Sequence, residues 1–301
     1  MADSRIPSPI RTAHVAGDGA FADALRDVAD SDAATLLLWP DAVVSPDCDS
    51  YVAAGLAASE GEILTAGVAI ALPRFRPMDG APFVPLEDGS DGVYLRVDPF
   101  PGAAFTPQQA RHYLAWLEDY PGGASPFVRY LTDTGRYLMT PRTPLAHDGG
   151  CGRTLQRGFP VGPRDWKLAP PGESLALYDA DFELATEAAA RLCPELAGFD
   201  LDIDLWGVKG DRAARPFLLS SRPCARPIRT LGLSLTPVEA NLMGATSGVM
   251  FSLGRREDFA APDKARHLAL ARHVTRFSSL TDYAGQFLAP ARRLFSGGAR
   301  Q

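Results

Sequence analysis

Short apolar runs alternate with amphipathic segments through the first 72 residues of the chain. The runs at 10–15, 35–39 and 63–72 have the length of buried strands. Between them, Phe21, Leu25 and Val28 recur at helical spacing, and residues 51–58 are a small-residue helical stretch. The order β-α-β-α-β is the one that builds a parallel sheet with helices packed on it. We therefore expect an N-terminal α/β domain over residues 1–75.

Prolines and glycines break this pattern over residues 73–91 and predict a domain boundary there. A strand is expected at 92–97, followed by a loop that holds Pro99, Pro101 and Gly102. Thr106 and Pro107 have the residue types that cap and open a helix.

Residues 127–131 and 136–140 flank a Thr-Asp-Thr-Gly sequence and predict a β-hairpin. Residues 141–174, rich in Gly and Pro, predict a long loop beside a functional cleft.

The remaining pattern predicts a helix, two strands and a helical tail. Asp181 can cap a helix that runs to Leu192, and strands are expected at 199–208 and 216–221 on either side of a charged turn. Leu270, Val274 and Phe277 then recur at helical spacing. The chain thus predicts a mixed α/β protein with segments at 1–75, 76–230 and 231–301, the last of them helical.

Composition narrows the class of protein. Of 301 residues, 46% are hydrophobic and 22% are charged, which is ordinary for a globular chain. Acidic residues outnumber basic ones 36 to 30, and no Lys/Arg-rich run is present, so nucleic acid is not an expected partner. No apolar run approaches the ~20 residues that span a bilayer. Four scattered cysteines and a start without signal-peptide order lead us to expect a cytoplasmic protein with reduced thiols.

Three aspartates follow one another at alternate positions of a predicted strand. Asp200, Asp202 and Asp204 share one face, and apolar side chains share the other. Three neighbouring carboxylates repel unless solvent, arginines or a divalent cation neutralises them. Two interpretations stay open: an antiparallel strand with a solvated face, and a Mg²⁺ site.

Other polar positions also have two interpretations each. Arg222, Arg226 and Arg229 form either a solvated connection or an anion site. His147, before Asp148 and two glycines, is either a general base or an ordinary loop residue. Lys167 either reaches a phosphate or is a surface lysine.

Residues 92–228 resemble the ATP-grasp superfamily in the order of their elements. The helix at 181–193, the Gly-Phe-Asp-Leu-Asp-Ile strand, the charged turn and the Phe-Leu-Leu-Ser-Ser-Arg-Pro strand are similar to the end of that fold. Residues 93–98 and 127–130 look like its nucleotide-clasping strands. The closing Ser-Arg-Pro also looks like that of phosphoenolpyruvate-synthase-type nucleotide domains, in which the arginine meets phosphate.

The resemblance implies ATP and Mg²⁺ as cofactors. It implies phosphate contacts for Arg96, Arg129 and Arg222, and metal ligation by Asp202 and Asp204 with Asp200 beside them; Lys167 is a further candidate for cofactor binding. The chain departs from the family at two places. Leu219-Ser220-Ser221 stands where the family has Glu-x-Asn, and Arg96 stands where it has a clasping lysine.

Residues 10–72 are similar instead to GT-A glycosyltransferases. Leu36-Leu37-Leu38-Trp39-Pro40-Asp41 resembles their metal-binding stretch, an apolar strand that ends in Asp-x-Asp, with only Asp41 of the pair kept. This resemblance implies a nucleotide sugar as the ligand.

The function expected from the sequence is ATP-dependent carboxylate activation for amide or peptide bond formation. Arg222 and His147 are the expected catalytic residues, acting on a small-molecule or peptide substrate, and no membrane partner is expected. A GT-A-type glycosyltransferase, a non-catalytic binding protein on a degenerate enzyme fold, and a homodimeric state all stay open.

Overall fold

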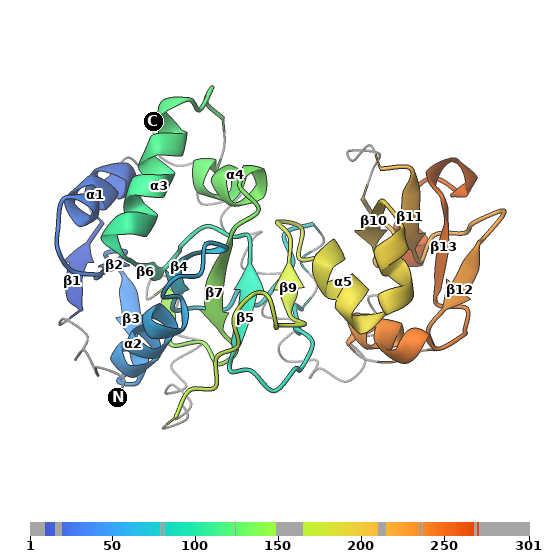
Figure 1. The fold of residues 1–301 in the computed structure, drawn as a ribbon, viewed down its shortest axis with the longest axis horizontal. Coiled ribbons are helices and arrows are strands. Elements are labelled where there is room, and N and C mark those ends of the chain that lie inside the picture. Colours follow the sequence, from blue (N-terminus) through green and yellow to red (C-terminus); the bar gives the residue numbers. More distant parts are fainter. Residues whose placement is uncertain are drawn as a thin grey trace, which may run out of the picture. The chain divides into compact units, whose positions relative to one another are not determined.

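Figure 1 shows the fold of the protein in a computed structural model. It describes residues 10–15, 20–78, 80, 82–123, 125–148, 165–209, 215–233, 235, 237–267 and 270. The chain divides into two compact units: unit 1 comprises residues 1–73 and 87–182, and unit 2 comprises residues 74–86 and 183–301. The boundary predicted within 73–91 falls where the chain leaves unit 1 and returns to it. The predicted segment 76–230 contributes residues to both units.

Unit 1 is built on a mixed sheet of seven strands in the order β1-β2-β6-β4-β7-β5-β9. The strands are β1 (Arg11–His14), β2 (Thr35–Leu38), β4 (Thr65–Ala69), β5 (Gly92–Leu95), β6 (Gly102–Phe105), β7 (Tyr137–Pro141) and β9 (Leu177–Tyr178). β1 and β2 are parallel, and helix α1 (Ala20–Ala29) connects them as the sequence predicts.

Strand β6 was not predicted, because its residues were expected to form a loop. It lies between β2 and β4 and is antiparallel to both. The first β-α-β-α-β elements therefore do not form one parallel sheet. Gly102 permits this insertion: a Cβ there would come within 2.8 Å of a methyl group of Leu38 and within 2.9 Å of one of Ile70. The backbone carbonyl oxygen of Leu37 would also lie 3.0 Å from such a Cβ, so the glycine that indicates a loop in the sequence allows close packing inside the sheet.

Helices cover both faces of this sheet (Figure 1). Successive strand side chains point to opposite faces. Leu37 and Phe105 pack in one core with α1, α3 (Pro107–Glu118) and α4 (Pro126–Asp133). Leu36, Leu38 and Ala104 pack in another core with α2 (Cys48–Ala58). Burial on both faces explains why β2 is apolar at three successive positions.

Helix α3 begins where the sequence predicts. The Thr106 hydroxyl oxygen accepts a hydrogen bond from the backbone N–H of Gln109 at 3.2 Å, and the side-chain Oε1 of Gln109 accepts one from the backbone N–H of Thr106 at 2.9 Å. This reciprocal capping box satisfies two backbone donors at the helix start. The Gln109 amide also donates to the Thr65 carbonyl, which attaches α3 to β4.

The predicted hairpin at 127–140 is wrong in its first strand, because residues 127–131 belong to helix α4. Pro126 occupies its first turn, and Phe127, Tyr130 and Leu131 bury one face at helical spacing. Gly135, at φ 68°, follows its end. The Thr-Asp-Thr-Gly sequence therefore forms the C-terminal end of a helix. The second strand of the predicted hairpin is present as β7.

The predicted loop 141–174 contains a short strand. β8 (Ala146–Asp148) pairs antiparallel with β3 (Ala42–Val44) in a two-stranded sheet. Residues 149–164 lie outside the described residues, so the expected role of this loop at a cleft stays a prediction. Its last part packs on α2, where Trp166 contacts Tyr51 edge to face with ring centroids 4.9 Å apart.

Unit 2 contains a second sheet in the order β10-β11-β13-β12. Its strands are β10 (Leu201–Asp204), β11 (Phe217–Ser220), β12 (Arg229–Leu231) and β13 (Phe251–Arg255). β10 and β11 are parallel, in contrast to the solvated antiparallel strand considered for Asp200–Asp204, and β13 is antiparallel to both β11 and β12. Helix α5 (Thr186–Leu192) and the 3-10 helices η2 (Pro194–Gly198), η3 (Val238–Ala245) and η4 (Arg256–Asp258) complete the described elements.

Two predicted helices of unit 2 differ from the structure. α5 begins after Ala185 rather than after Asp181. The segment 231–301, predicted to be helical, contributes strand β13, whose Phe251 and Leu253 alternate with small residues at the period of a strand. Residues 264–267 are helical, but Val274 and Phe277 of the predicted apolar face lie outside the described residues.

The fold class is therefore mixed α/β, as the sequence predicts. None of the helices in the described part of the chain has both the length and the apolar composition that crossing a bilayer requires.

Candidate anion-binding site

The aspartates of β10 are buried to very different degrees. The exposed fraction of the side chain falls from 68% at Asp200 to 19% at Asp202 and 1% at Asp204. Leu201 and Ile203 are buried between them, as period-2 alternation requires. The strand therefore carries its carboxylates from solvent into the protein, and the deepest of them needs partners.

Asp204 has four hydrogen-bonding or charged partners. Its Oδ1 accepts the backbone N–H groups of Val208 at 2.9 Å and Lys209 at 3.1 Å. Its Oδ2 accepts the Ser220 hydroxyl at 3.2 Å and lies 3.7 Å from Nη1 of Arg222. Burial raises the pKa of Asp204, and the backbone donors and Arg222 oppose that shift.

Two further arginines neutralise the outer aspartates. Arg256, from η4, forms an ion pair with Asp202. Arg215, which precedes β11, has its Nε 3.6 Å from Asp200 and 3.8 Å from Asp202. Burial raises the pKa of Asp202, and Arg256 and Arg215 act in the opposite direction. Arginines therefore fill the neutralising role that the sequence left open between arginines and a cation.

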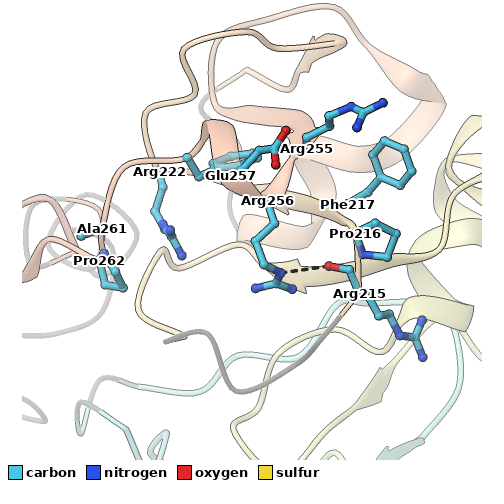
Figure 2. A pocket seen from close by; sticks show the side chains of 10 residues that line it. Arg215, Pro216, Phe217, Arg222, Arg255, Arg256, Glu257, Ala261 and Pro262 are labelled. Carbon is cyan, nitrogen blue, oxygen red and sulfur yellow. Dashed lines mark hydrogen bonds between the residues drawn. The ribbon is translucent and has the colours of Figure 1, made fainter.

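These arginines line a pocket of about 840 Å³ in unit 2 (Figure 2). Its wall comes from residues around β11 and from the end of β13 through η4, and consists of Arg215, Pro216, Phe217, Arg222, Arg255, Arg256, Glu257, Phe259, Ala261 and Pro262. Figure 2 shows Arg222, Arg256 and Arg215 extending to one side of the pocket and Arg255 extending away from them. The Nε–H of Arg256 donates to the Arg215 carbonyl at 2.9 Å.

The pocket lining is rich in arginine. It holds four arginines and one carboxylate, that of Glu257, and three of these arginines are also paired with the aspartates of β10. Because guanidinium groups are always charged and present several donors in one plane, such a lining favours ligands that carry phosphate or carboxylate groups. Arg255 is exposed and has no ion pair with any described residue, so its charge is not offset locally.

Arg222 has a structural role as well as a place in the pocket wall. Its side chain is 5% exposed, and its Nε–H donates to the Ala260 carbonyl at 2.7 Å. Nη1 contacts the Lys209 carbonyl at 3.4 Å besides Asp204. A phosphate at Arg222 would therefore share the guanidinium with these acceptors. Arg222 does not have two parallel N–H donors free for an anion.

The aspartates do not fit a metal centre as they are arranged. Both oxygens of Asp204 accept hydrogen bonds, and Asp202 is paired with Arg256. Among the described residues, no group of three or more His, Cys, Asp or Glu side chains is placed to hold a metal ion. Ser220 occupies the region where the resembled family has its metal-binding Glu-x-Asn, and its hydroxyl serves Asp204 instead. A magnesium ion at Asp200, Asp202 and Asp204 is therefore supported by the resemblance alone and not by the arrangement of these side chains.

The other predicted site residues lie in unit 1. The Arg96 guanidinium lies over the Tyr137 ring, 4.4 Å from its centroid, and Arg129 pairs with Asp133 on the exposed side of α4. Arg129 is therefore on a helix and not on a nucleotide-clasping strand. Lys167 is exposed, and His147 lies on β8 opposite Val43.

Three of the four arginines of the pocket were missed by reasoning from the sequence: Arg215, Arg255 and Arg256. The available signal was the tandem Arg255-Arg256, which follows the alternating pattern Phe251-Ser252-Leu253. Read as a strand with two arginines at its end, that stretch would have indicated a basic edge beside the predicted aspartate strand. This strand was not predicted because residues 231–301 were expected to be helical.

Asp41, the residue that carries the resemblance to glycosyltransferases, lies in unit 1. It is exposed in the turn between β2 and β3. No protein-family model matches this sequence, and a search among curated proteins finds no relative.

Proposed function

We propose that the protein binds ATP through the arginine-lined pocket of unit 2 and uses it to activate a carboxylate for amide or peptide bond formation. The observation that carries this proposal is the lining itself, four arginines against one glutamate in a volume of about 840 Å³. The choice of ATP among phosphate-bearing ligands rests on the resemblance of residues 92–228 to the ATP-grasp superfamily.

A cluster of guanidinium groups suits the proposed chemistry. In the reaction, a carboxylate oxygen attacks the γ-phosphorus of ATP, the bond to the bridging oxygen breaks, and acyl phosphate and ADP form. An amine then attacks the acyl carbon, and inorganic phosphate leaves with the carbon–oxygen bond electrons. Negative charge accumulates on phosphate oxygens during the first step, and fixed arginines stabilise it without reorganisation.

The pocket also offers apolar surface beside its charges. Phe217 and Phe259 belong to the lining, and the Arg222 guanidinium lies 5.9 Å from the Phe259 ring centroid. Aromatic rings give a nucleobase a stacking surface, and stacking on them contributes about 1–3 kcal/mol per base in nucleic-acid complexes. A ligand with both a base and a phosphate chain therefore matches the lining better than phosphate alone.

Arg215 provides the cleanest test of binding, because its side chain is half exposed and contributes little to the core. We expect Arg215→Gln to weaken ATP binding by about 1–3 kcal/mol, the scale of a lost charge-assisted hydrogen bond. Isothermal titration calorimetry with ATP and with pyrophosphate measures this loss. Arg226→Gln is the matched control, since Arg226 is also an exposed arginine of unit 2 but does not line the pocket.

Equal ATP affinity in the wild type, Arg215→Gln and Arg226→Gln would remove the pocket from the proposal. Titrations repeated in EDTA test the magnesium prediction separately, because affinity that is unchanged without a divalent ion argues against it. The catalytic part is tested with hydroxylamine, which traps acyl phosphates as hydroxamates. Absence of hydroxamate with a broad panel of amino acids and small carboxylic acids, while ATP still binds, would favour the non-catalytic binding protein.

A nucleotide sugar is the second candidate ligand, because the exposed Asp41 follows the buried strand β2 as the glycosyltransferase resemblance requires. UDP-glucose in the same titrations distinguishes the two. If UDP-glucose binds, and if Asp41→Asn abolishes this binding while Arg215→Gln leaves it unchanged, the ligand is a nucleotide sugar and not ATP.

A further inference from the structure

A second group of cationic side chains lies in unit 1, where α3, α4, β5 and β7 come together. We call it the Arg136 cluster, and it consists of Arg96, His112, Tyr130, Arg136 and Tyr137. Only one of these residues, Arg96, is among the site residues that the sequence predicts. Its geometry is independent of the pocket in unit 2, because all five residues belong to unit 1.

Arg136 is held at one nitrogen and open at the other two. Its Nη1 donates to the Tyr130 hydroxyl at 2.9 Å and contacts Nδ1 of His112 at 2.9 Å. Among the described residues, no acceptor contacts its Nη2 or Nε. The open Nη2–Nε edge is the one with which a guanidinium forms two parallel hydrogen bonds to a carboxylate or a phosphate.

Arg96 is fixed beside it in the same manner. Its Nε–H donates to the carbonyl oxygen of Arg136 at 3.3 Å, and its Nη2 donates to the Tyr137 hydroxyl at 2.9 Å. The guanidinium also stacks on the Tyr137 ring. A side chain held at three points loses little freedom when it binds a ligand, so its remaining donor, Nη1, is preorganised.

The charge of this cluster is not offset within the described part of the chain. Neither Arg96 nor Arg136 forms an ion pair with a carboxylate there, whereas Arg129 on helix α4, which also carries Tyr130, is paired with Asp133. The pKa of His112 is lowered, first by burial and then by Arg136 and Arg111. A guanidinium can only donate, so Nδ1 of His112 is the acceptor in its contact with Arg136.

We propose that the Arg136 cluster is a binding site for a phosphate group of a small molecule, held by the open edge of Arg136 and by Nη1 of Arg96. Phosphate is favoured over a carboxylate because its three terminal oxygens can accept from both guanidiniums at once. His112 contacts Nη1 of Arg136, the nitrogen that is not part of this open edge, so it lies beside the proposed site and senses its charge.

His112 also provides a direct readout of this site. The pKa of His112 is followed by NMR of the imidazole protons with and without sodium sulfate, whose charge does not change near neutral pH. His112→Gln assigns the resonance. A bound dianion offsets the arginine charge, so we expect sulfate to raise the pKa of His112. Titrations with inorganic phosphate, pyrophosphate and ATP then give the affinities and show whether a free ion or a nucleotide binds better.

Arg136→Gln is the decisive variant, and Arg129→Gln is its matched control, since both remove one arginine from the same region of unit 1. We expect Arg136→Gln to weaken phosphate binding about tenfold and to abolish the effect of sulfate on His112. Arg129→Gln should change neither. The Arg215→Gln protein should behave as wild type, which separates this site from the pocket of unit 2.

Sulfate that leaves the pKa of His112 unchanged in the wild type would overturn the proposal, as would an equal response in Arg136→Gln. Tyr130→Phe is a second variant in case Arg136→Gln does not fold. It keeps the aromatic ring and removes the hydroxyl that accepts a hydrogen bond from Arg136. Phosphate affinity should fall in this variant too, and unchanged affinity in folded Tyr130→Phe and folded Arg136→Gln would also contradict the proposal.

Discussion

Asp204 and Arg222 form a buried ion pair at the centre of unit 2. The carboxylate has backbone and hydroxyl donors in addition to the arginine, so its charge is well compensated. Removing one member of a buried pair leaves the other charge desolvated, which costs more than the pair itself contributes. The pair therefore fixes the end of β10 against β11, and it also fixes the position of Arg222 in the pocket wall.

Replacing Asp204 by Asn should lower the free energy of unfolding by about 3 kcal/mol, because Arg222 stays buried without a counter-charge. Asp200→Asn is the matched control on the same strand: Asp200 is 68% exposed, and a change below about 0.5 kcal/mol is expected there. Urea denaturation of both variants gives the comparison. Similar losses at the two positions would mean that burial does not determine the role of these aspartates.

Glu239 is a fully buried carboxyl group of η3, and its Oε2 has no hydrogen-bond partner among the described residues. Burial raises the pKa of Glu239 to about 7, although the nearby Arg76 opposes the shift. The folded state then keeps a proton that the unfolded chain releases near its ordinary pKa of 4.5. This group therefore makes folding less favourable as the pH rises from about 4.5 to about 7, and has a constant effect above that.

Glu239→Gln should remove this pH dependence. Between pH 5 and pH 8, the free energy of unfolding of the wild type should fall relative to that of the variant by an amount on the order of 3 kcal/mol. Urea denaturation of both proteins at the two pH values measures it. A difference that stays constant with pH would show that Glu239 is ionised in the folded protein throughout.

Most elements of the N-terminal half follow from hydrophobic spacing, but strand partners do not. The residues of β1, α1, β2, α2 and β4 carry periodicities that local sequence can show. The insertion of β6 beside β2 depends on how closely two backbones can approach at Gly102, and that is a tertiary property. In α4 the apolar positions Phe127, Tyr130 and Leu131 fit a helix, and the glycine after it was mistaken for a hairpin turn.

The capping box of α3 is the element whose sequence signal and structure agree best, and its contribution can be measured. Thr106→Ala should lower the free energy of unfolding by about 1 kcal/mol, because the Gln109 backbone N–H loses its acceptor. Thr106→Ser keeps a hydroxyl at the same place and should cost much less. If Ala and Ser are equivalent in thermal denaturation, the cap does not stabilise α3.

At the level of the complete chain, the aspartates and Arg222 can be predicted as site residues from the sequence. The arginines that neutralise the outer aspartates cannot. Arg215 precedes β11 and Arg256 follows β13, and only the pairing of β10 with β11 and of β11 with β13 brings both to the aspartate face. The division into two units was also hidden, because residues 74–86 belong to a unit whose remainder begins at residue 183. Contacts between residues so distant in sequence leave no local pattern.

The proposed function requires the arginine-lined pocket of unit 2 to hold the phosphates of ATP. A crystal structure of the protein with a non-hydrolysable ATP analogue would locate these phosphates. We expect electron density for the triphosphate against Arg215 and Arg256, with Arg222 still paired to Asp204. A bound analogue whose phosphates contact neither Arg215 nor Arg256 would contradict the proposed function.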